Sequence, residues 1–216
     1  MRPRTTSIPG GDGERPSMHD ATLRVRLLDR ACEMLAAHGP GSLSLRRVAG
    51  DVGTSTTAIY SLFGSKAELL KAINQEAWQR FARHLRGIED TGDAFQDILE
   101  LGKAYRASAE ANPHYYQVMV GVGLFSEPGK PRDLPDTGGT FELLLSKVER
   151  YLAERGLPRE EDVVYLAAAL WSAVHGVVSL EITGILNNRV GTPAVLVEQV
   201  VRAILAGWPP GQGGRP

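Results

Sequence analysis

The sequence has one cysteine, Cys32, and almost no net charge, −1 at pH 7. A single cysteine excludes an intramolecular disulfide and disfavours a thiolate metal cluster. The histidines show no spacing typical of metal ligands, so we expect no metal site. The balanced charge gives no general sign of a protein that binds polyanions. Only residues 1–70 are slightly basic, with nine Lys or Arg against seven Asp or Glu.

Motifs of known catalytic sites are also missing. We find no nucleophile elbow, P-loop, HExxH motif or pair of carboxylates at a typical spacing. The sequence therefore favours neither an enzyme nor a protein with a bound cofactor. A catalytic site assembled only in three dimensions, from residues distant in the sequence, stays open as an alternative.

Long hydrophobic runs are limited to residues 163–180, which contain no Asp, Glu, Lys or Arg. This length is enough to suggest a transmembrane helix. The run is rich in alanine, however; it contains Ser172, His175 and Ser179, and acidic residues flank both ends. We therefore expect a buried or interface helix and no membrane contact. The N-terminal region lacks the apolar segment of a signal peptide, so we also expect a cytoplasmic protein.

Helical periodicity covers most of the chain, and the two-residue alternation of β-strands is missing, so we predict an all-α fold. Ser44 and Ser65 are typical N-caps, and Gly39 is typical of a helix end. The first helix should end near His38. Later helices are expected after Ser44 and at about 55–61, 65–86, 93–111, 113–122, 139–155, 160–184 and 193–206.

Proline and glycine mark the segments between and beyond these helices. We expect a disordered arm over residues 1–20, a long loop over 123–138 and a flexible tail over 208–216. Between the arm and the tail we expect an N-terminal domain, residues 21–66, and a larger C-terminal domain, residues 67–207.

The first three predicted helices have the spacing of a helix-turn-helix motif. Ala49 is small where a second helix must cross closely, and Gly53 falls in the turn, where positive φ is often required. Ile59 would fill the core shared with the first helix. A generic three-helix core without a DNA partner is the alternative reading of this pattern.

Residues 48–70, VAGDVGTSTTAIYSLFGSKAELL, resemble the signature of the TetR family of transcriptional regulators. The matching side chains combine small residues at the helix crossing with an aliphatic–tyrosine pair and a later apolar pair. They are Ala49, Gly53, Ile59, Tyr60, Phe63, Lys66, Leu69 and Leu70. The upstream helix matches as well, through Leu27, Leu28, Ala31, Leu35 and Gly39. The resemblance implies a regulator that binds double-stranded DNA.

The resemblance also implies roles for single residues. Residues 55–61 resemble the recognition helix, in which Ser55, Thr56, Thr57 and Ala58 would face base edges and Ser61 lies at a position that often contacts the backbone. Hydroxyl groups suit either base pair, and methyl groups suit thymine. Phosphate contacts are implied for Ser44, Arg46, Tyr60 and Lys66.

Three residues depart from the family pattern: Thr54, Thr57 and Ser61 stand where an aliphatic residue, Gly or Lys, and His or Arg are common. The helix has no arginine for a bidentate contact with guanine. Arg2, Arg4 and Arg15 in the arm could supply further contacts, or the arm could serve only solubility.

The C-terminal half resembles a TetR subgroup with a Trp-X-X-X-His-Gly element, here Trp171, His175 and Gly176. By this resemblance it should hold a small-molecule effector. Aromatic side chains and methionine suit a mostly apolar ligand, although aromatic residues at helical spacing usually belong only to the core. The candidate lining residues are Tyr105, Tyr115, Tyr116, Met119, Phe125, Trp171 and His175.

Small residues follow one face of the helix predicted at 160–184: Ala169, Ser172, Gly176, Ser179 and Thr183. With an apolar face on the last helix (Leu196, Val197, Val200, Val201 and Ile204) this predicts a four-helix homodimer interface. Two recognition helices would then lie about 34–36 Å apart on a palindromic operator. We expect a repressor released by a small hydrophobic molecule; an activator, or a helical adaptor that binds no DNA, are the alternatives.

Overall fold

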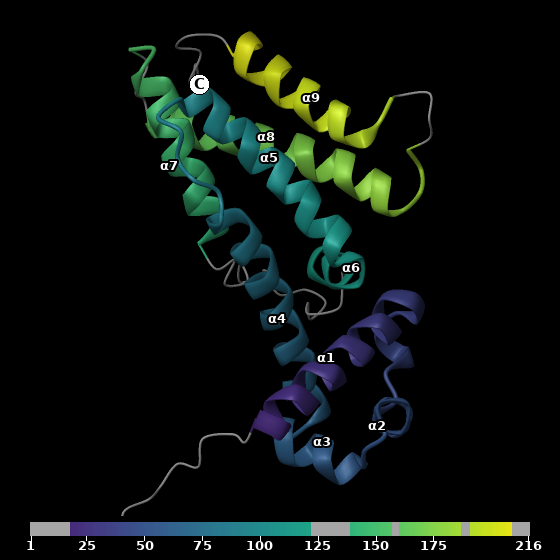
Figure 1. Ribbon diagram of the computed structural model, residues 1–216. Coiled ribbons are helices and arrows are strands. Elements are labelled where there is room, and N and C mark those ends of the chain that lie inside the picture. Colours follow the sequence, from purple (N-terminus) through teal and green to yellow (C-terminus); the bar gives the residue numbers. More distant parts are fainter. Residues whose placement is uncertain (1–17, 122–138, 157–159, 187–190, 209–216) are drawn as a thin grey trace, which may run out of the picture.

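The computed structural model describes residues 18–121, 139–156, 160–186 and 191–208. Within these ranges the chain is helical, with no strand, which confirms the all-α prediction. Figure 1 shows a small bundle joined to a larger one. The elements are α1 (Met18–His38), η1 (Pro40–Ser42), α2 (Leu45–Val52), α3 (Thr56–Phe63), α4 (Lys66–Arg86), α5 (Ala94–Ala111), α6 (Pro113–Val120), α7 (Thr140–Ala153), α8 (Glu160–Ile182) and α9 (Pro193–Gly207).

The small bundle consists of α1, α2, α3 and the start of α4. Ala49 is 2% exposed and Ile59 1%, so both lie in its core as predicted. Gly53 caps α2 with φ 77° and ψ 39°, a left-handed conformation that costs glycine little and a β-carbon more. This turn sets the angle between α2 and α3.

The helix α4 belongs to both bundles. It contacts α1 and α3 of the small bundle and α5 and α6 of the larger one, and α6 in turn contacts α1. In Figure 1 it runs from the small bundle into the larger one without interruption. The predicted domain boundary at residues 66 and 67 therefore falls in the first turn of a continuous helix rather than in a linker.

The larger bundle packs α5 against α7, α8 and α9, and α8 against α9. A β-carbon at Gly102 would lie 3.3 Å from Val201 Cγ2 and 3.6 Å from Val197 Cγ1. Glycine thus lets α5 and α9 approach closely. Val197 and Val201 are 0% and 1% exposed, so they fill the core of the subunit and do not belong to the predicted dimer interface.

The ends of the helices differ from the prediction by one to three residues. α1 begins at Met18, inside the segment predicted as a disordered arm. Trp208 packs against the core, so the predicted flexible tail begins one residue later at the earliest. α3 continues to Phe63 because Leu62 and Phe63 both pack onto the core. Arm residues 1–17 and the predicted loop at 123–138 lie outside the described residues.

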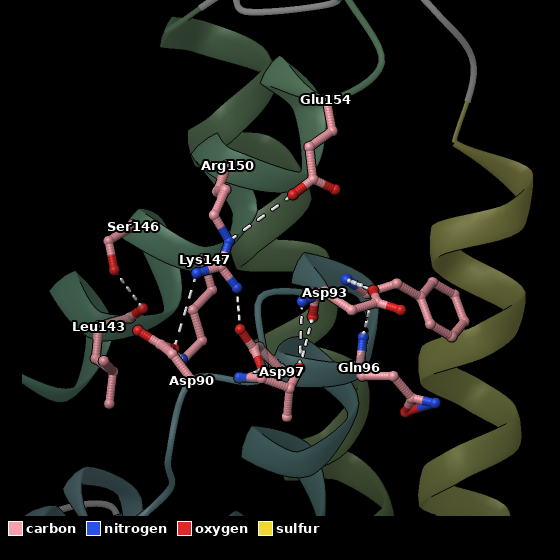
Figure 2. A network of polar contacts seen from close by, with 11 residues as sticks. Asp90, Asp93, Gln96, Asp97, Leu143, Ser146, Lys147, Arg150 and Glu154 are labelled. Atoms are coloured by element: carbon pink, nitrogen blue, oxygen red, sulfur yellow. Dashed lines mark hydrogen bonds and ion pairs between the residues drawn. The ribbon is translucent and has the colours of Figure 1, made fainter.

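A polar network fixes the start of α5 to α7 (Figure 2). Asp97 is fully buried and forms an ion pair with Arg150 of α7. Its Oδ1 accepts hydrogen bonds from the Thr91 amide at 2.8 Å and the Thr91 hydroxyl at 2.7 Å. Lys147 pairs with Asp90 beside it, and this hydrogen bond lowers the pKa of the Asp90 carboxyl.

Candidate functional site

The exposed face of α3 carries three side chains at the spacing i, i+3, i+4. Thr57, Tyr60 and Ser61 are exposed, and 53% of Tyr60 is open to solvent. The opposite face anchors the helix, with Ile59 buried and Phe63 8% exposed. Thr56 and Ala58 are half-buried at the edges of this face. The helix therefore presents hydroxyl groups to solvent, while the apolar side chains of its opposite face pack into the core.

Two residues predicted to contact DNA also cap helices. Ser44 Oγ accepts a hydrogen bond from the Arg47 amide at 3.4 Å and starts α2. Ser55 Oγ accepts one from the Ala58 amide at 3.2 Å and starts α3. A hydroxyl has one donor and two acceptor sites, so each serine keeps its donor for a phosphate or base.

Lys66 has a partner inside the chain that the sequence did not predict. Its Nζ donates to the Leu43 carbonyl oxygen at 2.7 Å, which connects the start of α4 to the junction of η1 and α2. The ammonium has three N–H donors, so one bond of this kind orients it and leaves capacity for a phosphate.

The segment from residue 52 to 67, which includes α3, contains no acidic residue. The nearest carboxylate before this segment, Asp51, forms an ion pair with Arg30 at 2.7 Å. Arg46 is exposed on the first turn of α2. The helix pair α2–α3 therefore presents a neutral-to-basic surface, which a polyanion can approach without meeting an unpaired carboxylate.

The second group of candidates gathers inside the larger bundle. The hydroxyl groups of Tyr105 and Tyr116 lie 2.9 and 3.0 Å from His175 Nδ1. Ser179 Oγ lies 3.1 Å from the Tyr116 hydroxyl and 3.4 Å from His175 Nε2. Burial lowers the pKa of His175, and the single lone pair of Nδ1 in a neutral ring accepts from one tyrosine hydroxyl at a time.

The other candidates border this cluster or lie on the side of α6 that faces α1. Tyr115 points to α1, where its hydroxyl donates to Asp29 Oδ1 at 2.9 Å. Trp171 is 46% exposed, with one side near Phe141 and His175. Met119 is 7% exposed beside a small cavity. Phe125 lies outside the described residues.

The junction of the two bundles contains functional candidates that the sequence analysis missed. Arg80 of α4 donates to Asp29 of α1 at 2.8 Å and to Glu76 at 2.7 Å, and its guanidinium lies 4.2 Å from the centre of the Tyr115 ring. Asn112 accepts from Arg80 at 3.4 Å. Asp29 and Arg80 are 51 residues apart, so no local motif could have connected them.

Cys32 is fully buried in the core, and burial raises the pKa of its thiol to about 12. A thiol needs to ionise and to be accessible to react with oxidants. Cys32 therefore packs as a small apolar side chain, with its thiol shielded from solvent. Across the described parts of the chain, no cluster of three or more His, Cys, Asp or Glu is arranged to hold a metal ion.

Two family models match the chain. The model described as "Bacterial regulatory proteins, tetR family" matches residues 27–73, which run from the middle of α1 to the first turns of α4. The model described as "Tetracyclin repressor-like, C-terminal domain" matches residues 98–204. The two matches together cover most of the chain. Neither description mentions a Trp-His-Gly subgroup, so that finer resemblance stays a prediction.

Curated relatives match most of the chain. An HTH-type transcriptional regulator of Mycobacterium tuberculosis is 24% identical over 213 residues, which cover 85% of this chain and 91% of the relative. The nucleoid occlusion factor SlmA of Vibrio vulnificus is 31% identical over 164 residues, 71% of this chain and 80% of the relative.

Solved structures share the fold. The protein SCO4313 superposes with a TM-score of 0.70 at 25% identity, and the match covers 89% of this chain and all of SCO4313. The regulator PfmR from Thermus thermophilus superposes with a TM-score of 0.63 at 22% identity, covering 85% of this chain and 99% of its own. The two-bundle architecture is therefore common to these regulators.

Proposed function

Because this chain belongs to the TetR family of bacterial regulators, we propose that it is a homodimeric repressor that leaves a palindromic operator when a small molecule binds its larger bundle. As a family member it is a DNA-binding transcriptional regulator and not an enzyme. What we propose beyond family membership is the dimer, the repression, the effector, the operator symmetry and the cytoplasmic location.

The observation that carries the proposal is the exposed face of α3. Thr57, Tyr60 and Ser61 stand together on a helix whose other face is buried, next to a turn set by Gly53. Such a helix enters the major groove with its exposed side chains toward the base edges. Fluorescence polarisation against the DNA upstream of the protein's own gene tests this. Equal affinity for that DNA and for random duplex at moderate salt would overturn it.

A Tyr60→Phe variant should bind every DNA sequence about three- to fivefold more weakly, because it loses one hydroxyl contact with a phosphate. The loss should be the same for operator and random duplex, since a phosphate contact carries no sequence information. The control is Ser146→Ala on α7, which removes an exposed hydroxyl outside both α3 and the proposed dimer interface. A loss confined to the operator would show that Tyr60 reads bases instead.

The proposed dimer interface is a stripe along α8. Along α8 the exposed positions are 160, 161, 164, 165, 171, 172 and 180, while positions 162, 166, 167, 170, 174 and 178 are buried. Four large apolar side chains lie on this stripe with 41–61% exposure: Val164, Tyr165, Trp171 and Leu180. Exposed apolar patches of this kind mark interaction surfaces.

This interface also accounts for the apolar length of α8. The helix is long and apolar enough to cross a membrane, with a mean hydropathy of 1.8 and 39% of its apolar window buried. Its buried face contacts α5, α7 and α9. A second copy of α8 would cover the apolar residues that this packing leaves exposed.

A Tyr165→Glu variant should shift the protein from dimer to monomer, because burial of an unpaired carboxylate at an apolar interface is costly. Sedimentation equilibrium at micromolar concentration measures the shift, which we expect to be at least tenfold in the dimer dissociation constant. Val25→Glu, at an apolar residue on α1 that is 44% exposed, is the control and should leave the dimer intact. If Tyr165→Glu remains as dimeric as the control, this face of α8 is not the interface.

Communication between effector and DNA would pass through the junction of Asp29, Arg80 and Tyr115. These residues come from α1, α4 and α6, and their side chains connect the small bundle to the larger one. A ligand that moves α6 or Arg80 therefore changes the position of α1. Such a ligand favours the arrangement that it binds better, and the DNA favours the other.

A further inference from the structure

An open pocket lies at the surface of α4, close to the start of α6. Its volume is about 360 Å³, and it is lined by Arg80, Arg83, His84 and Asn112. This size is at the lower end of the range of about 300–1,000 Å³ for small-molecule sites. Two of the four lining residues are permanently cationic and none is acidic, so the rim offers donors and positive charge.

The two arginines differ in their exposure and in the ion pairs that they already form. The Arg80 side chain is 20% exposed and pairs with both Asp29 and Glu76. The Arg83 side chain is 63% exposed and reaches Glu76 only at 3.5 Å. His84 Nδ1 lies 3.1 Å from the Arg80 carbonyl oxygen, which makes Nδ1 the donor and leaves Nε2 for another partner. Arg83 is therefore the cation that a ligand can engage at least cost.

A second hollow continues from this rim into the bundle. It shares Arg80 and Asn112 with the open pocket, and its other walls are mainly apolar or aromatic. Its volume is about 10 Å³, at the lower limit for a single water molecule. Side chains must move before a ligand enters, and Met119 on its wall is a flexible one. The remaining walls are Ala77, Phe81, Ser108, Tyr115 and Tyr116.

We propose that this site takes an amphiphilic anion, with its acidic group at Arg83 and its apolar body between Phe81, Tyr116 and Met119. The inference rests on the proposed function and deepens it, because it names the chemical class of the effector. Arg80 lines the same pocket as Arg83, so the acidic group held at Arg83 also competes with Asp29 for the Arg80 guanidinium. Ligand binding therefore weakens the ion pair that connects α1 to α4.

Sodium decanoate is a suitable probe because it combines a carboxylate with an unbranched apolar chain. In isothermal titration calorimetry at low salt we expect decanoate to bind at least about tenfold more tightly than decan-1-ol, as charge-assisted hydrogen bonds to arginine are strong. Decylammonium should not bind. Equal affinity for the acid and the alcohol, or no decanoate binding at about 1 mM, would overturn the proposal.

The Arg83→Gln variant should weaken decanoate binding about three- to tenfold, the range for a partly exposed charged contact, and leave decanol binding unchanged. Lys103→Gln makes the same change of charge on α5, outside the pocket, and should have no effect. Arg83 is exposed, so both variants should keep the wild-type melting temperature. Unchanged decanoate affinity in Arg83→Gln would contradict the site.

Two further measurements separate this inference from the proposed function. If the wild-type protein does not prefer its operator over random duplex, the regulator assignment is wrong, whatever decanoate does. If operator binding is sequence-specific but saturating decanoate leaves its dissociation constant unchanged, the anion is not the effector. We expect specific binding in the absence of decanoate and at least tenfold weaker operator binding in its presence.

Discussion

A Thr57→Glu variant is expected to lose at least about 100-fold in DNA affinity. Thr57 is exposed at the centre of the proposed reading face, so a carboxylate there meets the negative charge of the major groove and its phosphates. Like-charge contacts at an interface cost several kcal/mol, and about 1.4 kcal/mol corresponds to a factor of ten. Fluorescence polarisation at two salt concentrations measures the loss, which should shrink as salt screens the repulsion.

Thr57→Gln is the matched control for this variant. Glutamine and glutamate have nearly the same size and helix propensity, so both variants should keep the fold and the melting temperature. Thr57→Gln should change the preferred sequence but keep the affinity for random duplex. If the two variants bind DNA equally well, α3 is not the helix that enters the groove.

An Asp97→Ala variant is expected to destabilise the protein by about 3 kcal/mol. The substitution leaves Arg150 and the Thr91 amide without their shared carboxylate (Figure 2). Loss of one partner of a buried ion pair costs about 3–5 kcal/mol. We place the value at the lower end because the Arg150 side chain is 35% exposed. Urea unfolding at a fixed protein concentration measures the change.

Asp93→Ala serves as the control because Asp93 lies four residues earlier and caps α5. Its exposed carboxylate accepts from the Phe95 and Gln96 amides at 2.9 and 3.1 Å, and the loss of such a cap costs about 1 kcal/mol. The double variant Asp97→Ala/Arg150→Ala should cost less than the sum of its single changes. Additive costs would show that Asp97 and Arg150 do not act as a pair.

Local signals in the sequence are sufficient to predict where the described helices begin and end to within a few residues. Serine caps at 44 and 65 and the glycine at 53 act through backbone groups within four residues, and the structure has them in these roles. The same holds for the exposed face of α3, because helical periodicity separates Thr57 and Tyr60 from Ile59. The structure describes the exposure of this face, but the DNA contacts themselves all stay predictions: Ser44, Arg46, Ser55, Thr56, Thr57, Ala58, Tyr60, Ser61 and Lys66.

Contacts between residues that are distant in the sequence could not be predicted from it. Asp97 resembles any acidic residue in a first helical turn, and only the packing of α5 on α7 brings it to Arg150, 53 residues away. Tyr115 and Tyr116 are neighbours in sequence, but the helix turns them to different partners, Asp29 and His175. The sequence analysis treated both as lining one pocket, whereas Tyr115 also belongs to the junction of the bundles.

The continuity of α4 has a mechanical consequence. Arg80 and Lys66 lie 14 residues apart on one helix of 21 residues, which is about 21 Å of axis. A tilt of about 5° at the Arg80 end would displace the other end by roughly 2 Å. Hydrogen bonds to bases tolerate only a few tenths of an ångström. Because α4 is continuous, a small tilt near Arg80 becomes a larger displacement near Lys66. In the proposed symmetric dimer, the displacements of the two subunits would add along the operator.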